Sequence, residues 1–168
     1  ALVGWSNQLR YKDFSLNFLI DARVGGYVFS QTSTGLDRDG VSKRSLQYRE
    51  SGILVDATVA DTSEMNTKSI SAQEYWQAMA DVSANYVYGQ DNVRLREISI
   101  GYQLPSMPKF GIESATLQLV GRNLFFFSKD AEDIDPESMV GTTLGIQGIN
   151  ENAMPTAKSV GLNLSLNF

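Results

Sequence analysis

The final nine residues of the chain, 160–168, alternate apolar side chains with small or polar ones without a break. Successive side chains of a β-strand point to opposite faces, so this segment predicts a strand with one apolar and one polar face. The apolar face holds Val160, Leu162, Leu164, Leu166 and Phe168. Such a strand suits a membrane barrel, with lipid outside and water inside, and it also suits a soluble β-sandwich, which buries one face in its core.

The longest regular alternation covers residues 14–24. At about 3.3 Å per residue and a tilt of about 45°, such a strand rises roughly 25 Å, which is the height of the apolar band of an outer-membrane barrel. Strands of soluble proteins are usually about half as long. We therefore predict that the apolar side chains of this strand face lipid: Phe14, Leu16, Phe18, Ile20, Ala22 and Val24.

Three more segments alternate in the same way, namely residues 3–11, 93–104 and 115–126. Arg94 and Arg96 have the parity of the apolar residues in their segment, so we expect that end of the strand to rise beyond the hydrocarbon into water. The predicted lipid face is extended by Ile98, Ile100, Tyr102, Leu117 and Leu119.

The connections between the predicted strands alternate in length. Tight turns are expected at residues 11–13 and 105–111, and long polar loops at 26–91 and 128–155. Outer-membrane barrels have short periplasmic turns and long extracellular loops. No stretch approaches the roughly 20 apolar residues of a membrane helix, so any span must consist of strands. The predicted fold is all-β, an antiparallel transmembrane β-barrel segment over residues 1–168 without a separate domain.

The composition excludes several kinds of chemistry. The chain has no cysteine and no histidine, which excludes disulfides, zinc sites of the Cys/His type and triads with an imidazole base. A formal charge of -5 with scattered basic residues argues against nucleic acid as a partner. Charged pairs such as Asp21 with Arg23, or Glu97 with Arg122, need no catalytic reason inside a barrel. We expect neither enzymatic activity nor a cofactor.

The first long loop contains a helix signal. Ser71 and Glu74 match a capping box and precede an apolar stripe, so a helix is expected over about residues 72–80. Aromatic residues on this helix and near the end of the loop have two interpretations. They either anchor the loop against its own neighbours or contact a ligand or partner protein. The residues concerned are Tyr75, Trp76, Tyr86 and Tyr88.

The second long loop concentrates acidic side chains, whose oxygen atoms are the ligands that calcium prefers. Their spacing fits no calcium loop, and the glycine that would form a sharp turn is missing. A solvated acidic loop is therefore favoured over a metal site. The weak metal candidates are Asp130, Glu132, Asp133 and Asp135.

Several short motifs occur in the order and spacing of one known family. They lie at residues 11–16, 25–26, 71–76, 93–96, 101–102, 104–105, 121 with 123–124, 135–137, and 161–162 before Phe168. On these motifs, the chain resembles the C-terminal part of a SusC/RagA-type TonB-linked outer-membrane transporter. Two departures are mild: Arg122 stands where the family often has glutamine, and Ala157 leads into the last strand.

The resemblance implies a plugged barrel of about 22 strands, driven through TonB from the inner membrane and covered by a SusD-like surface lipoprotein. The implied function is import of glycan or peptide oligomers across the outer membrane of a Gram-negative bacterium. Five strands cannot close a barrel of this class, so the plug, the TonB-contacting part and the other strands would lie outside this chain. The alternative function is that of a soluble β-sandwich carbohydrate-binding module.

The last predicted strand carries one further expectation. Its apolar side chains and the terminal aromatic residue are expected to be recognised by the outer-membrane insertion machinery, because an exposed edge strand must be captured before it pairs with another chain. The predicted insertion signal consists of Leu162, Leu164, Leu166 and Phe168.

Overall fold

The computed structural model describes residues 1–60, 62–131, 133–139 and 148–168. The chain divides into two compact units. Unit 1 contains Ala1–Gly26, Gly89–Glu137 and Pro155–Phe168. Unit 2 contains Tyr27–Tyr88 and Ser138–Met154.

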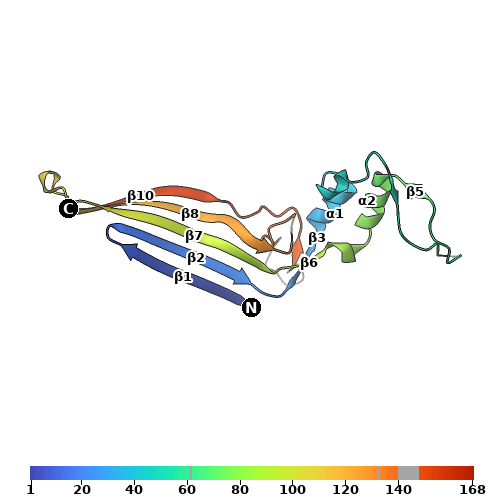
Figure 1. The fold of residues 1–168 in the computed structure, drawn as a ribbon, viewed down its shortest axis with the longest axis horizontal. Coiled ribbons are helices and arrows are strands. Elements are labelled where there is room, and N and C mark those ends of the chain that lie inside the picture. The colour runs from blue at the N-terminus through green and yellow to red at the C-terminus, as the bar shows by residue number, and fades with distance from the viewer. Residues whose placement is uncertain (61, 132, 140–147) are drawn as a thin grey trace. The chain divides into compact units, whose positions relative to one another are not determined.

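Unit 1 is a five-stranded antiparallel sheet with the strand order β1-β2-β7-β8-β10 (Figure 1). Each strand pairs with the one before it in this unit, so the sheet is a meander with the long segments inserted between β2 and β7 and between β8 and β10. The all-β antiparallel fold and the five predicted strands are confirmed. The strands are β1 (Leu2–Tyr11), β2 (Phe14–Arg23), β7 (Asn92–Leu104), β8 (Ser114–Lys129) and β10 (Ser159–Asn167).

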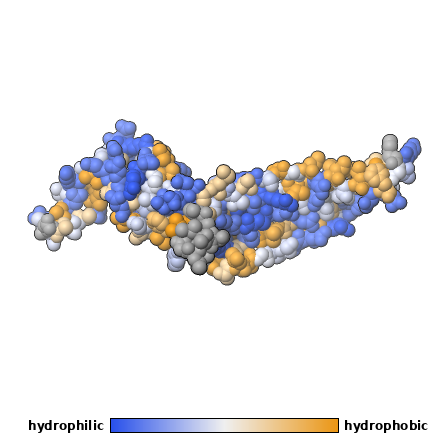
Figure 2. All heavy atoms as spheres, turned by 180° about the vertical axis from the view of Figure 1, so that it is seen from behind, coloured by the Kyte–Doolittle hydropathy of each residue, from blue (hydrophilic) through white to orange (hydrophobic). Residues whose placement is uncertain are grey.

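The pairing register gives all five strands a shared apolar face, although single apolar residues such as Leu19 and Val120 pair with Glu97 and Ser99 on the other face. Residues directly opposite each other in a sheet share a face, and one such row contains Leu9, Leu16, Ile100, Leu119 and Leu162. The row is solvent-exposed: Ile100 is 51%, Leu119 50% and Leu162 70% accessible. This exposure differs from what a β-sandwich requires, since a sandwich buries the inner face of each of its sheets. Figure 2 shows hydrophobic residues gathered in patches along the strands, beside hydrophilic ones.

The opposite face of the sheet is polar and internally hydrogen-bonded. Ser99 accepts hydrogen bonds from the side-chain amides of Asn17 at 3.1 Å and Gln118 at 2.9 Å. Further along the same strands, Arg122 donates to Glu97 at 2.8 Å. Three neighbouring strands are therefore joined by side chains as well as by their backbones.

A β-bulge in β7 changes which residues lie on each face. Leu19 of β2 pairs with Glu97, but the next residue, Ile20, pairs with Leu95, so Arg96 is one extra residue on β7. Before the bulge Arg94 pairs with Asp21 and thus lies on the polar face. The prediction that Arg94 and Arg96 continue the apolar face is therefore wrong. An uninterrupted alternation cannot reveal where one residue is inserted.

Unit 2 forms from the two segments predicted as long loops, and it contains short helices and strands. A three-stranded sheet has the order β6-β3-β9, and β4 pairs with β5. No helix in the described ranges is long and apolar enough to cross a membrane. The elements are β3 (Tyr27–Ser30), α1 (Gln31–Arg38), η1 (Arg44–Leu46), β4 (Ile53–Leu54), β5 (Ser69–Ile70), α2 (Ala72–Ala80), η2 (Ser83–Tyr86), β6 (Val87–Gly89) and β9 (Ile149–Asn150).

The two α-helices of unit 2 begin at serine caps. Helix α2 begins and ends where predicted, and its capping box is present: the Ser71 hydroxyl accepts from the Glu74 amide at 3.2 Å, and the Glu74 carboxylate accepts from the Ser71 amide at 3.0 Å. Helix α1 was not predicted. Its cap is Ser30, which accepts from the amide of Ser33 at 3.0 Å, and no glutamate or glutamine completes a recognisable box.

The interior of unit 2 is organised around the buried carboxylate of Asp37, which is 1% exposed. It accepts hydrogen bonds from Ser42 at 2.6 Å and from the hydroxyl of Tyr86 at 3.0 Å, and it pairs with Arg44 at 2.5 Å. The Arg44 guanidinium lies 5.6 Å from the ring centre of Trp76 and 5.2 Å from that of Tyr86. Burial and the hydrogen bond to Asp37 raise the pKa of the Tyr86 hydroxyl above its ordinary value.

Replacing Asp37 by alanine is expected to destabilise unit 2 by about 3 kcal/mol, because it leaves the partly buried Arg44 without its carboxylate and Tyr86 without an acceptor. Amide hydrogen exchange of α1 and α2 in the full-length protein measures this loss. The matched control is Asp81→Ala, which removes the exposed pair with Arg38 at 2.7 Å and should cost less than about 1 kcal/mol. Equal effects of the two substitutions would contradict the central role of Asp37.

Candidate functional site

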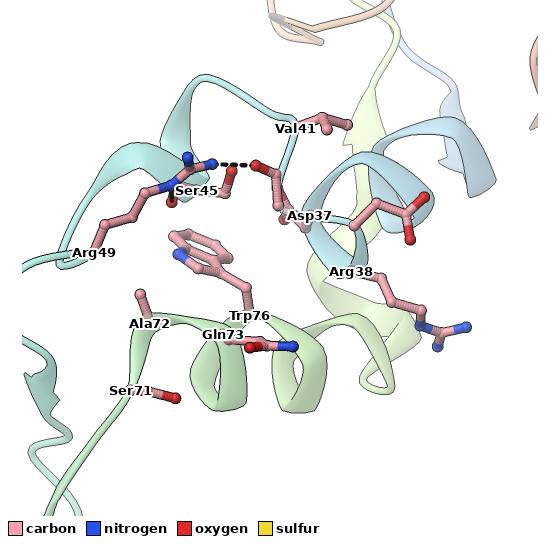
Figure 3. A pocket seen from close by; sticks show the side chains of 11 residues that line it. Asp37, Arg38, Val41, Ser45, Arg49, Ser71, Ala72, Gln73 and Trp76 are labelled. Carbon is pink, nitrogen blue, oxygen red and sulfur yellow. Dashed lines mark hydrogen bonds between the residues drawn. The ribbon is translucent and has the colours of Figure 1, made fainter.

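A cavity of about 650 Å³ lies in unit 2 between α1, α2 and the segment that follows η1. Trp76 projects from α2 toward the segment that carries Ser45 and Arg49 (Figure 3). Arg49 donates to the backbone oxygens of Ser45, at 3.1 Å, and of Gly40, so its guanidinium closes one side of the cavity. The buried indole nitrogen of Trp76 has no hydrogen-bond partner in the described part of the chain.

The four aromatic candidates of the first long loop differ in exposure and in the contacts they make. Tyr86 is 0% exposed, which contradicts contact with a ligand or partner. Trp76 packs edge-on against Tyr75 at 5.1 Å, and Tyr88 lies 3.4 Å from a guanidinium nitrogen of Arg44. These contacts favour the interpretation that the aromatic residues anchor the loop. A direct ligand contact by Tyr75, Trp76 or Tyr88 stays a prediction.

A second cluster lies on the polar face of unit 1, at the bulge in β7. Arg94 is almost fully buried and donates to Glu137 at 2.8 Å and to Thr156 at 3.2 Å. Arg96 donates to Glu137 at 2.6 and 3.0 Å and to Asp21 at 2.7 Å. Both ends of the connection between β8 and β10 are thereby held against β7. This cluster could not be predicted, because the bulge that brings both arginines to the polar face leaves no signal in the alternation of the sequence.

The acidic loop does not assemble a metal site from the residues that the structure describes, in which no three acidic side chains come together. Asp135 accepts from the amide of Thr156 at 2.9 Å, from its hydroxyl at 2.5 Å and from the amide of Glu137 at 3.0 Å. Burial opposes ionisation, but these hydrogen bonds outweigh it and hold the pKa of Asp135 below its ordinary value. Asp130 lies against Gly89, and Glu132 lies outside the described residues.

A cavity of about 440 Å³ adjoins the arginine cluster on the polar face. Its charged lining residues are Asp21, Arg23, Arg96 and Glu137, and residues 2–4 of β1 form another wall. A Cβ atom at Gly4 would meet open space there. Arg23 forms no ion pair with any described residue, so its positive charge is available at the cavity wall.

The residues predicted to face lipid lie together on one face of the sheet. Those of β2, β7 and β8 share the apolar face, and Val24 follows directly after β2. On β10, Leu162 is 70%, Leu164 55% and Leu166 39% exposed on the same face, and Phe168 is 79% exposed after the strand. Lipid contact and the insertion signal stay predictions.

Comparison with known proteins gives matches over nearly the whole chain. No model of a known protein family matches. The TonB-dependent receptor P3 of Formosa agariphila is 25% identical to this chain over an aligned length of 173 residues, gaps included. The alignment covers 99% of this chain and 16% of the receptor. The chain therefore spans about one sixth of the length of this curated relative.

Solved structures with the same fold include those of a peptide transporter. The RagAB peptide transporter matches with a TM-score of 0.59 and 19% identity, over 98% of this chain and 17% of the solved chain. The RagAB importer in the closed-closed state matches with a TM-score of 0.55 and 18% identity, over 99% of this chain and 17% of the solved chain. The resemblance drawn from the sequence motifs is thereby confirmed: over nearly its whole length the chain is similar in sequence to a segment of a TonB-dependent receptor and in fold to a segment of the RagAB peptide transporter.

Proposed function

We propose that this chain forms the C-terminal part of the barrel wall of an outer-membrane importer for oligomeric nutrients. The observation that carries the proposal is the exposed apolar face shared by all five strands of unit 1, backed by a polar face with its own hydrogen bonds. A wall of this kind separates lipid from a water-filled interior. Strands upstream of β1 in the full protein would complete the barrel.

The remaining parts of the machinery are proposed from the relatives. A plug and a TonB-contacting segment would lie in the part of the protein outside this chain, and energy would reach the barrel through TonB. Unit 2 would stand on the extracellular side, where a SusD-like lipoprotein would cover the barrel. This placement is supported by the short connections at the other end of the sheet, such as the turn at Lys12.

The proposed cargo is an oligomer, either a glycan or a peptide. The solved relatives are named as peptide transporters, and no residue of this chain distinguishes the two classes by itself. We propose no catalytic role, since charged side chains and ion pairs on the polar face suit a water-facing wall without one. The test of the whole proposal is loss of growth on the oligomer after deletion of the gene, restored by the full-length protein.

The apolar face should tolerate charge far less than the polar face. Phe18→Arg is expected to destabilise the folded barrel by about 2 to 4 kcal/mol near the bilayer midplane, and Asn17→Arg by far less, because the two neighbouring side chains face lipid and water respectively. Urea unfolding of the full-length protein in lipid vesicles measures both. Equal tolerance at the two positions would refute the lipid face.

The inserted segment between β2 and β7 should be reachable from outside the cell. A cysteine at the exposed Thr62 is expected to react with a membrane-impermeant maleimide in intact cells, because this chain has no other cysteine and the segment is proposed to be extracellular. The matched control is Lys12→Cys in the opposite turn, which should react only after lysis. The reverse pattern would invert the proposed topology.

A further inference from the structure

Two arginines of β7 converge on one carboxylate. Glu137 receives hydrogen bonds from Arg94 at 2.8 Å and from both terminal nitrogens of Arg96 at 2.6 and 3.0 Å. A guanidinium fork that meets both oxygens of a carboxylate is the strongest arrangement by which proteins recognise that group. Glu137 therefore occupies the position that a carboxylate ligand would take between these two side chains.

The site is closed on one side and open on the other. The Arg94 side chain is 2% exposed, and its guanidinium lies 4.5 Å from the ring centre of Phe126. Burial and this aromatic contact hold the Arg94 guanidinium in place. The side chains of Arg96 and Glu137 are 29% and 27% exposed and both line the 440 Å³ cavity. A ligand in this cavity reaches Arg96 without passing Arg94.

The charges around the cavity balance only while Glu137 is present. Three arginines, Arg23, Arg94 and Arg96, lie near three carboxylates, those of Asp21, Asp135 and Glu137. If the Glu137 side chain moves away, Asp135 keeps its ion pair with Arg94 at 3.8 Å and its hydrogen bond from Thr156. Asp21 keeps its ion pair with Arg96 at 2.6 Å. Withdrawal of Glu137 would leave a net charge of one positive in this group, because Arg94 and Arg96 keep Asp135 and Asp21 while Arg23 has no ion-pair partner in the described residues.

We propose that the guanidinium pair of Arg94 and Arg96 is a carboxylate-binding site, filled at rest by the chain's own Glu137, and that a carboxylate of the cargo replaces Glu137 on Arg96. The inference rests on the proposed function, because import brings cargo to the polar face of the sheet. It narrows the cargo to oligomers that carry carboxylates, such as acidic peptides or acidic glycans. Arg23 is the group that attracts the entering charge.

The exchange of carboxylates has a consequence for the connection between β8 and β10. The amide of Glu137 donates to Asp135 at 3.0 Å, so the ion pairs and the backbone hydrogen bond hold the same turn. When a cargo carboxylate displaces the Glu137 side chain from Arg96, this turn loses two of the hydrogen bonds that attach it to β7 and keeps its contacts with Arg94. Cargo binding is thus reported by the exchange rate of backbone amides around residue 137.

The experiment uses the purified full-length protein in detergent and hydrogen–deuterium exchange. The probe is tetraglutamate, and the control probe is tetraglutamine at the same ionic strength. Tetraglutamate is expected to accelerate exchange around residue 137 about tenfold, which corresponds to about 1.4 kcal/mol of lost attachment, whereas tetraglutamine leaves it unchanged. Equal exchange with both probes would overturn the proposal and leave a purely structural ion pair.

Two variants sharpen the test. Glu137→Gln removes the internal carboxylate. In this variant, the backbone amides around residue 137 should exchange fast without any probe, and tetraglutamate should not accelerate their exchange further. Glu97→Gln is the matched control, because it removes the carboxylate of the more exposed pair with Arg122 and should respond to the probe as the unchanged protein does. A lost response in Glu97→Gln would contradict the assignment to Arg94 and Arg96. Because the measurement does not require transport, failed import in cells would bear on the proposed function alone.

Discussion

The two-residue period of paired β-strands decides which side chains of unit 1 meet each other. Through four antiparallel pairings, residues of alternate parity lie on opposite faces, except that the bulge at Arg96 exchanges the two parities along β7. Every other property of this unit depends on that order. It creates the apolar rows, leaves the amides of Asn17 and Gln118 on either side of Ser99, and brings charged residues together on the face away from the apolar rows.

Much of this sheet could be predicted, because strand length, alternation and connection length are all local properties of the sequence. Residues 14–24 illustrate this, since their apolar parity continues without interruption. The bulge at Arg96 could not be predicted. Its presence depends on how β7 pairs with β2 and β8. A one-residue shift in this pairing cannot be inferred from the type of the residue at which it occurs.

Unit 2 shows the same division between local and non-local information. The capping box of Ser71 and Glu74 lies within one turn, so α2 was predictable from its own residues. The cluster of Asp37, Arg44 and Tyr86 joins residues that are up to 49 positions apart. A polar segment with a charged interior resembles a solvated loop in sequence, because its acids and bases neutralise one another only after folding.

The bulge also fixes where strand β7 accepts a change of length. Glu97 and Leu95 already lie on opposite faces, so removal of Arg96 would leave β7 in regular register with β2. Removal of a residue such as Ser99 would instead reverse the faces of everything on one side of it. Aligned sequences that differ by a single gap in this strand should therefore have that gap at position 96.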